Sequence, residues 1–306
     1  MSEIRVGMAA PRGARVGSLE QRQRLVAAIA EAGLDHVGCS DHVSFHGGTG
    51  FDGLIQAAQL ASLHDELPVV VAVYLLPLRH PTPVARQISS IAEAAPGRLI
   101  FGVGVGGEDP QEYAVCGVDP RTRGRRADEA LRVLRGLLTG ERVTHAGEFY
   151  PLEAAQVLPA PEPAVPIWVG GRSEAALRRT ARYGDGYIGV WLSPERMAAS
   201  GARIRELAEA AGRDASPMDL ALYVWCGLGD TREAARARVA AAMQDLYRID
   251  FERFERYTPY GNAEQVAESL APYVEAGCRT FHLVPVCEDD AASVELCGEV
   301  KRLLSA

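Results

Sequence analysis

The sequence predicts an α/β fold, a barrel of eight parallel strands that alternate with helices. Short apolar runs alternate with stretches of helical period along almost all of the 306 residues. The runs are continuous rather than alternating, as expected for parallel strands buried on both faces. Units of about 38 residues fit a (β/α)8 barrel with insertions, and a doubly wound open sheet is the alternative.

The candidate strands are continuous apolar runs at 4–9, 35–40, 67–78, 97–107, 165–171, 186–191, 218–226 and 279–286. The candidate helices have amphipathic spacing and cover 18–32, 52–65, a segment that begins near 82, 121–139, 173–183, 194–211, 231–248, 263–276 and 289–304.

Local signals mark several helix ends. Ser18 is a candidate N-cap, Gly33 a C-terminal stop, and Thr82 with Pro83 a favourable N-cap and first-turn pair. An irregular stretch with a hairpin at 140–165 follows the fourth strand, and an additional helix follows the seventh. We therefore expect insertions after strands 4 and 7 of one domain that spans residues 1–306.

Composition limits the classes of partner. The 32 basic and 40 acidic residues give a net charge of −8, spread along the chain, which argues against nucleic acid. Any phosphate site must then be built locally, and because Lys301 is the only lysine, arginines must supply its side-chain charge. The six cysteines lack metal spacing, and the sequence shows neither a secretory signal nor a membrane-length apolar run. We expect a cytoplasmic protein with reduced thiols.

The stretch GCSDHVSFHGGTGFDG, residues 38–53, places Asp41 and His42 where the second strand ends. Five glycines within these sixteen residues indicate a backbone with unusual torsion angles. The two side chains either cap a turn or form the floor of a site, with His42 as an acid or base. His46 suggests a metal ligand, but no HxH or HExxH pattern supports one, and we expect no metal.

Glycines also follow strands four and five. In VGGRSEAA, Gly170 and Gly171 leave a strand, Arg172 follows, and Ser173 can cap a helix. Such a loop either binds an anion through backbone N–H groups or is an ordinary capped turn. GVGVGG at 102–107 matches GxGxxG, but Pro110 and acidic residues follow in place of a pyrophosphate-binding helix. These glycines either leave room for a flat ligand or another backbone, or fit a bulged strand.

Several longer stretches resemble the luciferase-like monooxygenase superfamily, particularly its actinobacterial branch that uses the deazaflavin coenzyme F420. They include AGLDHVGCSDH, the segment from VAVYLLPLRHP to LLTGE, HAGEFYPL, PAVPIWVGGRSEAALRRTARYGDGY and YGNAEQVAESLAPYVEAGCRTFHLVP, in family order. The resemblance implies a TIM barrel that holds a flat isoalloxazine-type ring at the strand carboxyl ends.

The resemblance also implies roles for particular residues. His42 and Glu108 would be catalytic, and Asp41 would hydrogen-bond the polar edge of the ring. The other cofactor-binding residues would be Ala72 and Val73, joined by a cis peptide, with Gly104, Gly106, Gly107, Gly170, Gly171, Arg172, Ser173 and Val190. Phe45, His46, Tyr74 and Trp191 are the candidate substrate-pocket residues.

The implied activity is hydride transfer between coenzyme F420 and an unknown small organic substrate. The alternatives are a monooxygenase that uses FMNH₂ from a partner reductase, a non-catalytic flavin-binding protein, and a metal-dependent barrel hydrolase. Sugar-phosphate-oxidising relatives carry a tryptophan where this chain has Phe45 and His46, which argues against that substrate class. By resemblance, we expect a homodimer formed through helices near strands two and three.

Overall fold

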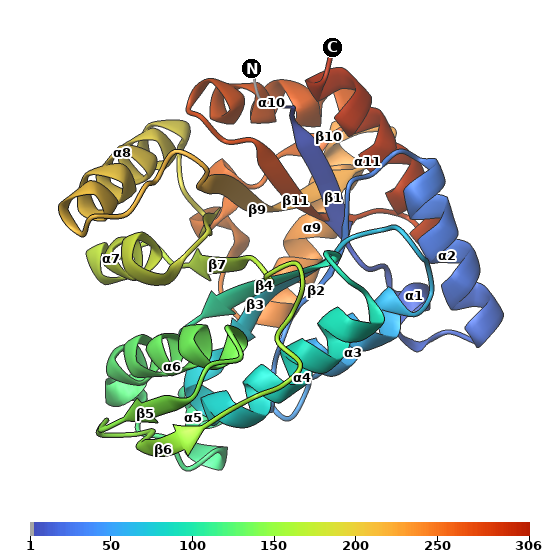
Figure 1. Ribbon diagram of the computed structural model, residues 1–306. Coiled ribbons are helices and arrows are strands. Elements are labelled where there is room, and N and C mark those ends of the chain that lie inside the picture. Colours follow the sequence, from blue (N-terminus) through green and yellow to red (C-terminus); the bar gives the residue numbers. More distant parts are fainter. Residues whose placement is uncertain (1–2) are drawn as a thin grey trace.

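The computed structural model describes residues 3–306 and has a closed parallel sheet at its centre (Figure 1). The barrel strands are β1 (Arg5–Ala9), β2 (Val37–Cys39), β3 (Val69–Leu75), β4 (Leu99–Gly104), β7 (Ile167–Gly170), β8 (Gly186–Val190), β9 (Asp219–Leu228) and β11 (Thr280–Val286). Neighbours pair in the order β9-β11-β1-β2-β3-β4-β7-β8, and a pairing of β8 with β9 closes the ring. The barrel prediction is confirmed.

Helices surround this ring, each near its predicted position (Figure 1). They are α2 (Leu19–Glu31), α3 (Gly53–Ala61), α4 (Pro81–Ala94), α6 (Arg123–Leu138), α7 (Glu174–Tyr183), α8 (Pro194–Ala210), α9 (Arg232–Tyr247), α10 (Ala263–Glu275) and α11 (Asp290–Leu304). Ser18 caps α2 as predicted, because its hydroxyl accepts a hydrogen bond from the Gln21 N–H. The start of α4 differs: His80 is the N-cap and Pro81 the first residue.

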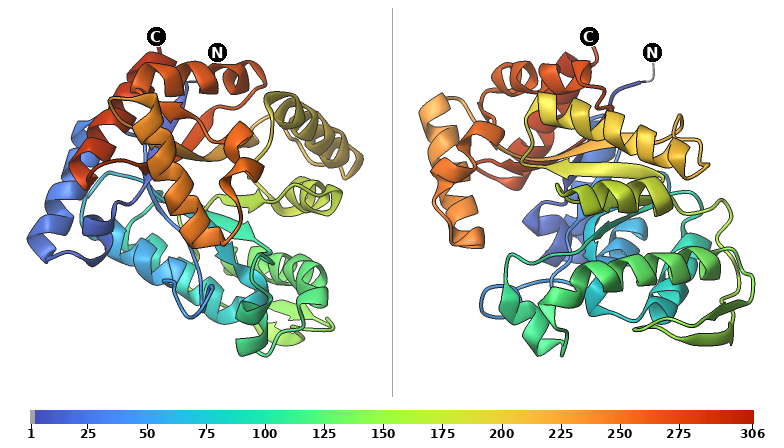
Figure 2. Two further views of the ribbon diagram at one scale, coloured as in Figure 1. Left: turned by 180° about the vertical axis from the view of Figure 1, so that it is seen from behind. Right: turned by 90° about the vertical axis from the view of Figure 1, so that its left-hand side faces the viewer.

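Both predicted insertions are present. The segment after β4 contains α5 (Pro110–Val115), the 3₁₀ turn η2 (Pro120–Thr122) and the hairpin β5 (Val143–His145) with β6 (Leu152–Ala155). The hairpin lies at the edge of the molecule, beyond α6 (Figure 2, right). The segment after β9 contains η3 (Phe251–Arg253), η4 (Glu255–Tyr257) and β10 (Tyr260–Gly261), which pairs with the end of β9. Two further short elements are α1 (Arg12–Val16) and η1 (Leu76–Leu78).

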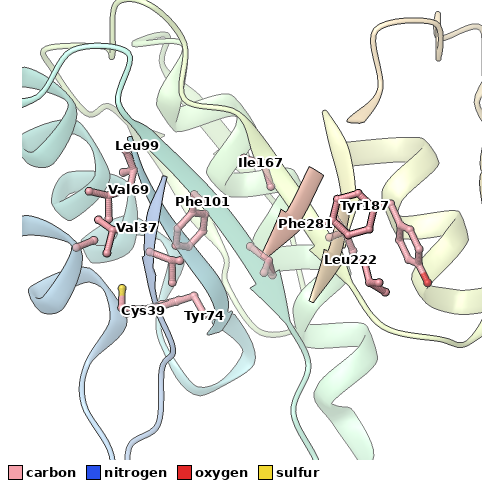
Figure 3. Close-up of a cluster of buried hydrophobic side chains, with 14 of the residues drawn as sticks. Val37, Cys39, Val69, Tyr74, Leu99, Phe101, Ile167, Tyr187, Leu222 and Phe281 are labelled. Atoms are coloured by element: carbon pink, nitrogen blue, oxygen red, sulfur yellow. The ribbon is translucent and has the colours of Figure 1, made fainter. Parts of the chain in front are cut away.

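The main hydrophobic core lies between the barrel and its helices. Val37, Val69 and Leu99 stand side by side on neighbouring strands and belong to this layer (Figure 3). Because side chains alternate along a strand, Val70 and Ala72 belong instead to a smaller cluster with Trp168 and Ile188 from other strands. This second cluster fills the barrel interior.

Two imidazoles also lie buried in the barrel. Nε2 of His36 and Nδ1 of His282 are 3.1 Å apart, and Tyr223 stacks on His282. Glycines make room for both rings: a Cβ on Gly7 would lie 2.3 Å from the His36 ring, and one on Gly38 would lie 2.1 Å from that of His282. Burial lowers the pKa of His282 to about 4 and that of His36 well below its usual value, so both rings are neutral.

Candidate active site

A cleft of about 390 Å³ opens where the loops after several barrel strands converge. Its place at the strand carboxyl ends is the one that a (β/α)8 barrel uses for binding and catalysis. Most of the predicted site residues line it: Asp41, His42, Phe45, Ala72, Val73, Gly104, Gly106, Glu108, Gly170, Gly171, Arg172, Ser173, Val190 and Trp191. The structure does not place Gly107, His46 or Tyr74 in the lining.

A bulge in β3 forms one apolar surface of the cleft. The register of β3 against β4 shifts between Val71 and Tyr74, and the peptide bond between Ala72 and Val73 is cis, as the resemblance implied. A Cβ on Gly104 would lie 2.4 Å from Cγ2 of Val73. The packing interpretation of the strand-four glycines is therefore confirmed at Gly104, which also lines the cleft.

The same bulge corrects the prediction for Tyr74. With strict alternation, Tyr74 would face the barrel interior like Val70 and Ala72. The register shift instead turns it to the helix side, where its ring packs against Phe101 at a centroid distance of 5.3 Å. Tyr74 is 1% exposed and therefore belongs to the core.

Asp41, which lines the cleft, also anchors the backbone around it. Its Oδ1 accepts hydrogen bonds from the Gly53 N–H and the Arg79 guanidinium, at 2.8 and 2.7 Å. Its Oδ2 accepts from the Leu75 N–H and from the same guanidinium, at 2.9 and 2.6 Å. Each oxygen thus already has two donors, which occupies its lone pairs. Asp41 ties the end of β2 to α3 and to the end of β3.

His42 is paired with Glu112, a residue of α5 that the sequence analysis missed. Nδ1 of His42 lies 3.2 Å from both carboxylate oxygens of Glu112. Oε1 of Glu112 also accepts the Val43 N–H at 2.7 Å and the Ser44 N–H at 3.3 Å. Burial opposes ionisation of this carboxyl, but these hydrogen bonds outweigh it and lower its pKa. We call His42 and Glu112 the acid–base pair.

The sequence contains a local signal for the start of α5, the helix that carries Glu112. Asp109 followed by Pro110 is an N-cap and first-turn pair, and the structure starts α5 there, with the Asp109 carboxylate accepting the Gln111 N–H. A short helix thus begins at Pro110, although its acidic first turn does not suit a pyrophosphate, as the sequence predicted. Glu108 remains in the cleft lining, while Glu112, in the first turn of α5, reaches His42.

The loop between His42 and α3 is held from two sides. The Phe45 ring stacks on His42 at a centroid distance of 4.1 Å. His46 has a φ of 38°, and its N–H donates to Asp109 at 2.7 Å, while the Arg248 guanidinium donates to its carbonyl. The backbone of His46 therefore holds the loop in place. The prediction that His46 lines the substrate pocket was wrong.

Residues 170–173 form the side of the cleft that we call the anchor loop. Gly171 has a φ of 127°, which favours glycine, and its carbonyl accepts a 2.8 Å hydrogen bond from the Tyr187 hydroxyl. Ser173 caps α7 by accepting the Ala176 N–H. Unsatisfied N–H groups at the start of α7 and the Arg172 guanidinium make this loop suited to an anion.

Aromatic side chains form a further part of the lining. Trp191 has a φ of 49°, and the Arg172 guanidinium lies 5.5 Å from its ring centroid. Within residues 3–306, the buried Nε1 of Trp191 has no hydrogen-bond partner. Tyr223 and Tyr247 complete this lining, and Tyr247 packs edge-on against Trp191. A bulky residue with positive φ is costly, and such strain concentrates at functional sites.

Positive charge in the cleft comes from Arg172, the only lysine or arginine among its described lining residues. Lys301 bonds to Asp35 and to the Gly33 carbonyl, just before the start of β2 and therefore at the opposite end of the barrel. Arginine thus supplies the side-chain charge of the cleft, as the sequence required.

Residues 3–306 contain neither a metal-binding cluster nor a membrane-spanning helix. No group of three or more His, Cys, Asp or Glu side chains is arranged to hold a metal ion in this part of the chain. None of its helices combines the length and the apolar character that crossing a bilayer requires.

Solved structures with the same fold cover all or nearly all of the chain. An F420-dependent secondary alcohol dehydrogenase, solved with an F420-acetone adduct, has a TM-score of 0.86 and 20% identity, with full coverage of both chains. A monooxygenase from Streptomyces bottropensis has a TM-score of 0.81 and 22% identity, with 97% of this chain and 98% of that chain covered. At these identities the likeness establishes the fold.

Sequence relatives are closer. An uncharacterised protein of Mycobacterium tuberculosis is 37% identical over 54% of this chain and 57% of its own length. An F420-dependent glucose-6-phosphate dehydrogenase of Kineococcus radiotolerans is 34% identical over 63% of this chain and 60% of its own length. The chain thus matches about three fifths of the length of these relatives. The family model for luciferase-like monooxygenases matches residues 3–280, and the chain belongs to that family.

Proposed function

We propose that this protein is a coenzyme F420-dependent oxidoreductase that transfers a hydride between the deazaflavin and a small, uncharged organic substrate. The observation that carries the proposal is the convergence of the anchor loop and the acid–base pair on one apolar cleft. The relative from Kineococcus radiotolerans, which is named for F420, supports the choice of coenzyme.

The residues present fit such a coenzyme. The β3 bulge at Ala72 and Val73, with Gly104 beside it, offers an apolar surface for a flat ring. The anchor loop offers backbone N–H groups and the Arg172 guanidinium for the phosphate. Bound there, the deazaflavin would accept or donate a hydride, and the protein would supply position and electrostatics.

His42 would handle the proton that accompanies the hydride. In the direction of alcohol oxidation, the hydroxyl proton of the substrate passes to Nε2 of His42 while the carbinol hydrogen leaves as hydride. Two electrons leave with the hydride, and a carbonyl group remains. Glu108, exposed on the cleft lining, is a second group able to exchange protons there.

The lining favours an uncharged substrate over a sugar phosphate. Arg172 is the one arginine or lysine among the described lining residues, and in this proposal it binds the coenzyme. Phe45 and the aromatic side chains of Trp191 and Tyr247 surround the remaining space. A second phosphate would have no partner there, which agrees with the absence of the tryptophan found in sugar-phosphate-oxidising relatives.

Paired fluorescence titrations with F420 and FMN, each oxidised and reduced, test the coenzyme. Tight binding of F420 alone, followed by its reduction with small alcohols, is the expected result. Preference for reduced FMN would replace the proposal with a two-component monooxygenase that depends on a reductase. Binding without any turnover would indicate a flavin-binding protein, and no binding below about 100 μM (about −5.5 kcal/mol) would remove the anchor-loop assignment.

We also propose a homodimer formed through α1, α2 and α3. Leu19 and Ile55 are 58% and 64% exposed, and the apolar side chains of Val16 and Phe51 are also exposed. The Arg15 guanidinium lies over the Phe51 ring, and its carbonyl accepts a bond from Gln59, so the helices are adjacent. Light scattering should give twice the chain mass, and Ile55→Glu should give monomers. A monomeric wild-type protein would contradict this proposal.

A cytoplasmic location remains part of the proposal. The cysteines of the described chain are all free, which agrees with a reducing compartment. Fractionation of cells that express the chain should recover it with cytoplasmic enzymes, and recovery outside the cell would contradict the location.

A further inference from the structure

Glu112 bonds both to the imidazole of His42 and to the backbone of the loop that carries it. Its side chain is buried, with 2% of the residue exposed, and α5 holds it in place. Its Oε1 accepts the Val43 and Ser44 N–H groups, and both oxygens face Nδ1 of His42 at 3.2 Å. An ionised carboxylate only accepts hydrogen bonds. Nδ1 must therefore carry a proton in both the neutral and the charged ring.

We infer that Glu112 is a positioning residue that holds neutral His42 as the Nδ1–H tautomer and leaves Nε2 facing the cleft as a proton acceptor. Within residues 3–306, Nε2 has no hydrogen-bond partner, whereas His42 lines the cleft. The stacked Phe45 ring fixes the plane of the imidazole. A carboxylate that fixes the tautomer of a catalytic histidine in this way raises the fraction of enzyme ready to take a proton.

The catalytic consequence rests on the proposed hydride transfer, but the tautomer does not. With Glu112 in place, the resting enzyme is prepared to remove a proton from a substrate hydroxyl. In the opposite direction, the imidazolium returns that proton to the carbonyl oxygen. The ring bonds to Glu112 through Nδ1–H in both states, so it need not reorient between them.

Glu112→Gln separates positioning from simple anchoring of the loop. The introduced amide keeps an oxygen for the Val43 and Ser44 N–H groups. Its NH₂ group then faces Nδ1 and donates to it, which favours the opposite, Nε2–H tautomer. A purely structural role for Glu112 would leave the tautomer unchanged as long as the loop stays folded.

Long-range ¹H–¹⁵N correlation spectra of the full chain at mildly alkaline pH report the tautomer without any coenzyme. The His42 signals are assigned by their loss in His42→Gln. We expect Nδ1 protonated and Nε2 bare in the wild type, and the reverse, or a mixture, in Glu112→Gln. A wild-type ring protonated on Nε2 would overturn the inference.

Asp109→Asn is the matched control, because Asp109 also lies at α5 and holds the same loop through the His46 N–H but does not touch His42. We expect this variant to keep the wild-type tautomer. In steady-state kinetics, Glu112→Gln should lower kcat by about 10²-fold with the KM of the substrate changed by less than about threefold. Unchanged kcat and tautomer would overturn the inference. If the wild-type ring has the expected tautomer but the protein does not turn over F420, the proposed function is contradicted and the inference about Glu112 is retained.

Discussion

The acid–base pair and the anchor loop belong to the same cleft, yet the chain builds them in opposite ways. The anchor loop is four consecutive residues from the last residue of β7 to the N-cap of α7, and its conformation follows from two glycines and a serine cap. The acid–base pair joins residues 70 positions apart, and it forms only when α5 packs against the loop after β2. Local chemistry therefore determines one side of the cleft, and tertiary packing determines the other.

The largest expected effect of a single substitution falls on the acid–base pair. His42→Gln removes the group that exchanges the substrate proton, so kcat/KM should fall by about 10³-fold. The anchor loop is untouched, and the Kd for F420 should stay within about threefold of the wild type. Stopped-flow reduction and fluorescence titration measure the two quantities separately. Full turnover by His42→Gln would show that the proton moves through another group, with Glu108 the first to examine.

A second test asks whether long-range contacts also stabilise the segment after β2, which carries Asp41 and His42. Asp41→Asn leaves the Arg79 guanidinium without its bidentate charge partner at a site where Asp41 is 1% exposed. The free energy of unfolding in urea should fall by about 3 kcal/mol. The exposed Arg203–Glu206 pair provides a control. Glu206→Gln should change the free energy of unfolding by less than about 0.5 kcal/mol. An equally small effect at Asp41 would mean that the hydrogen bonds seen there contribute little.

The same contrast explains which parts of the molecule were predictable. The strands and helices follow from periodicity and caps, both local, and the anchor loop follows from VGGRS. The features that the sequence did not predict depend on packing instead. Tyr74 faces the helix side because of the β3 bulge, and the carboxylate of Asp41, which lines the cleft, is bound by Arg79, 38 residues away. Glu112 was missed because no pattern in the sequence pairs it with His42.

A third test concerns the anchor loop alone. Gly171→Ala places a side chain at a φ of 127°, with its Cβ 2.9 Å from that of Ala176, and so disturbs the start of α7. The Kd for F420 should rise about tenfold, about 1.4 kcal/mol, while kcat at saturating coenzyme is retained.

Gly212→Ala is the control for this substitution, since Gly212 also has a positive φ but has open space where a Cβ would lie. It should lower stability by about 1 kcal/mol without changing the Kd. If both variants bind F420 like the wild type, the conformation of the anchor loop does not govern binding.

The smallest expected effect lies beneath the cleft, where His36 and His282 again join distant parts of the chain. The pKa of His282 is about 4 in the folded barrel, below the usual value of about 6.5 for an unfolded chain. Between these values the unfolded state binds a proton that the folded state does not. Stability is therefore complete above about pH 6.5 and falls as the pH falls, by about 1 kcal/mol between pH 6.5 and 5.5 for one such histidine.

Urea unfolding across this pH range measures the slope, and His282→Gln should make it shallower, because an amide does not titrate while still offering a hydrogen-bond partner to His36. His36, whose pKa burial also lowers, is present in both proteins and keeps its own contribution to the slope. An identical slope in the two proteins would mean that the imidazole pair opens to solvent before the barrel unfolds. The barrel interior would then be less rigid than the cleft built upon it, and the acid–base pair would have to keep its geometry through α5 and Phe45 alone.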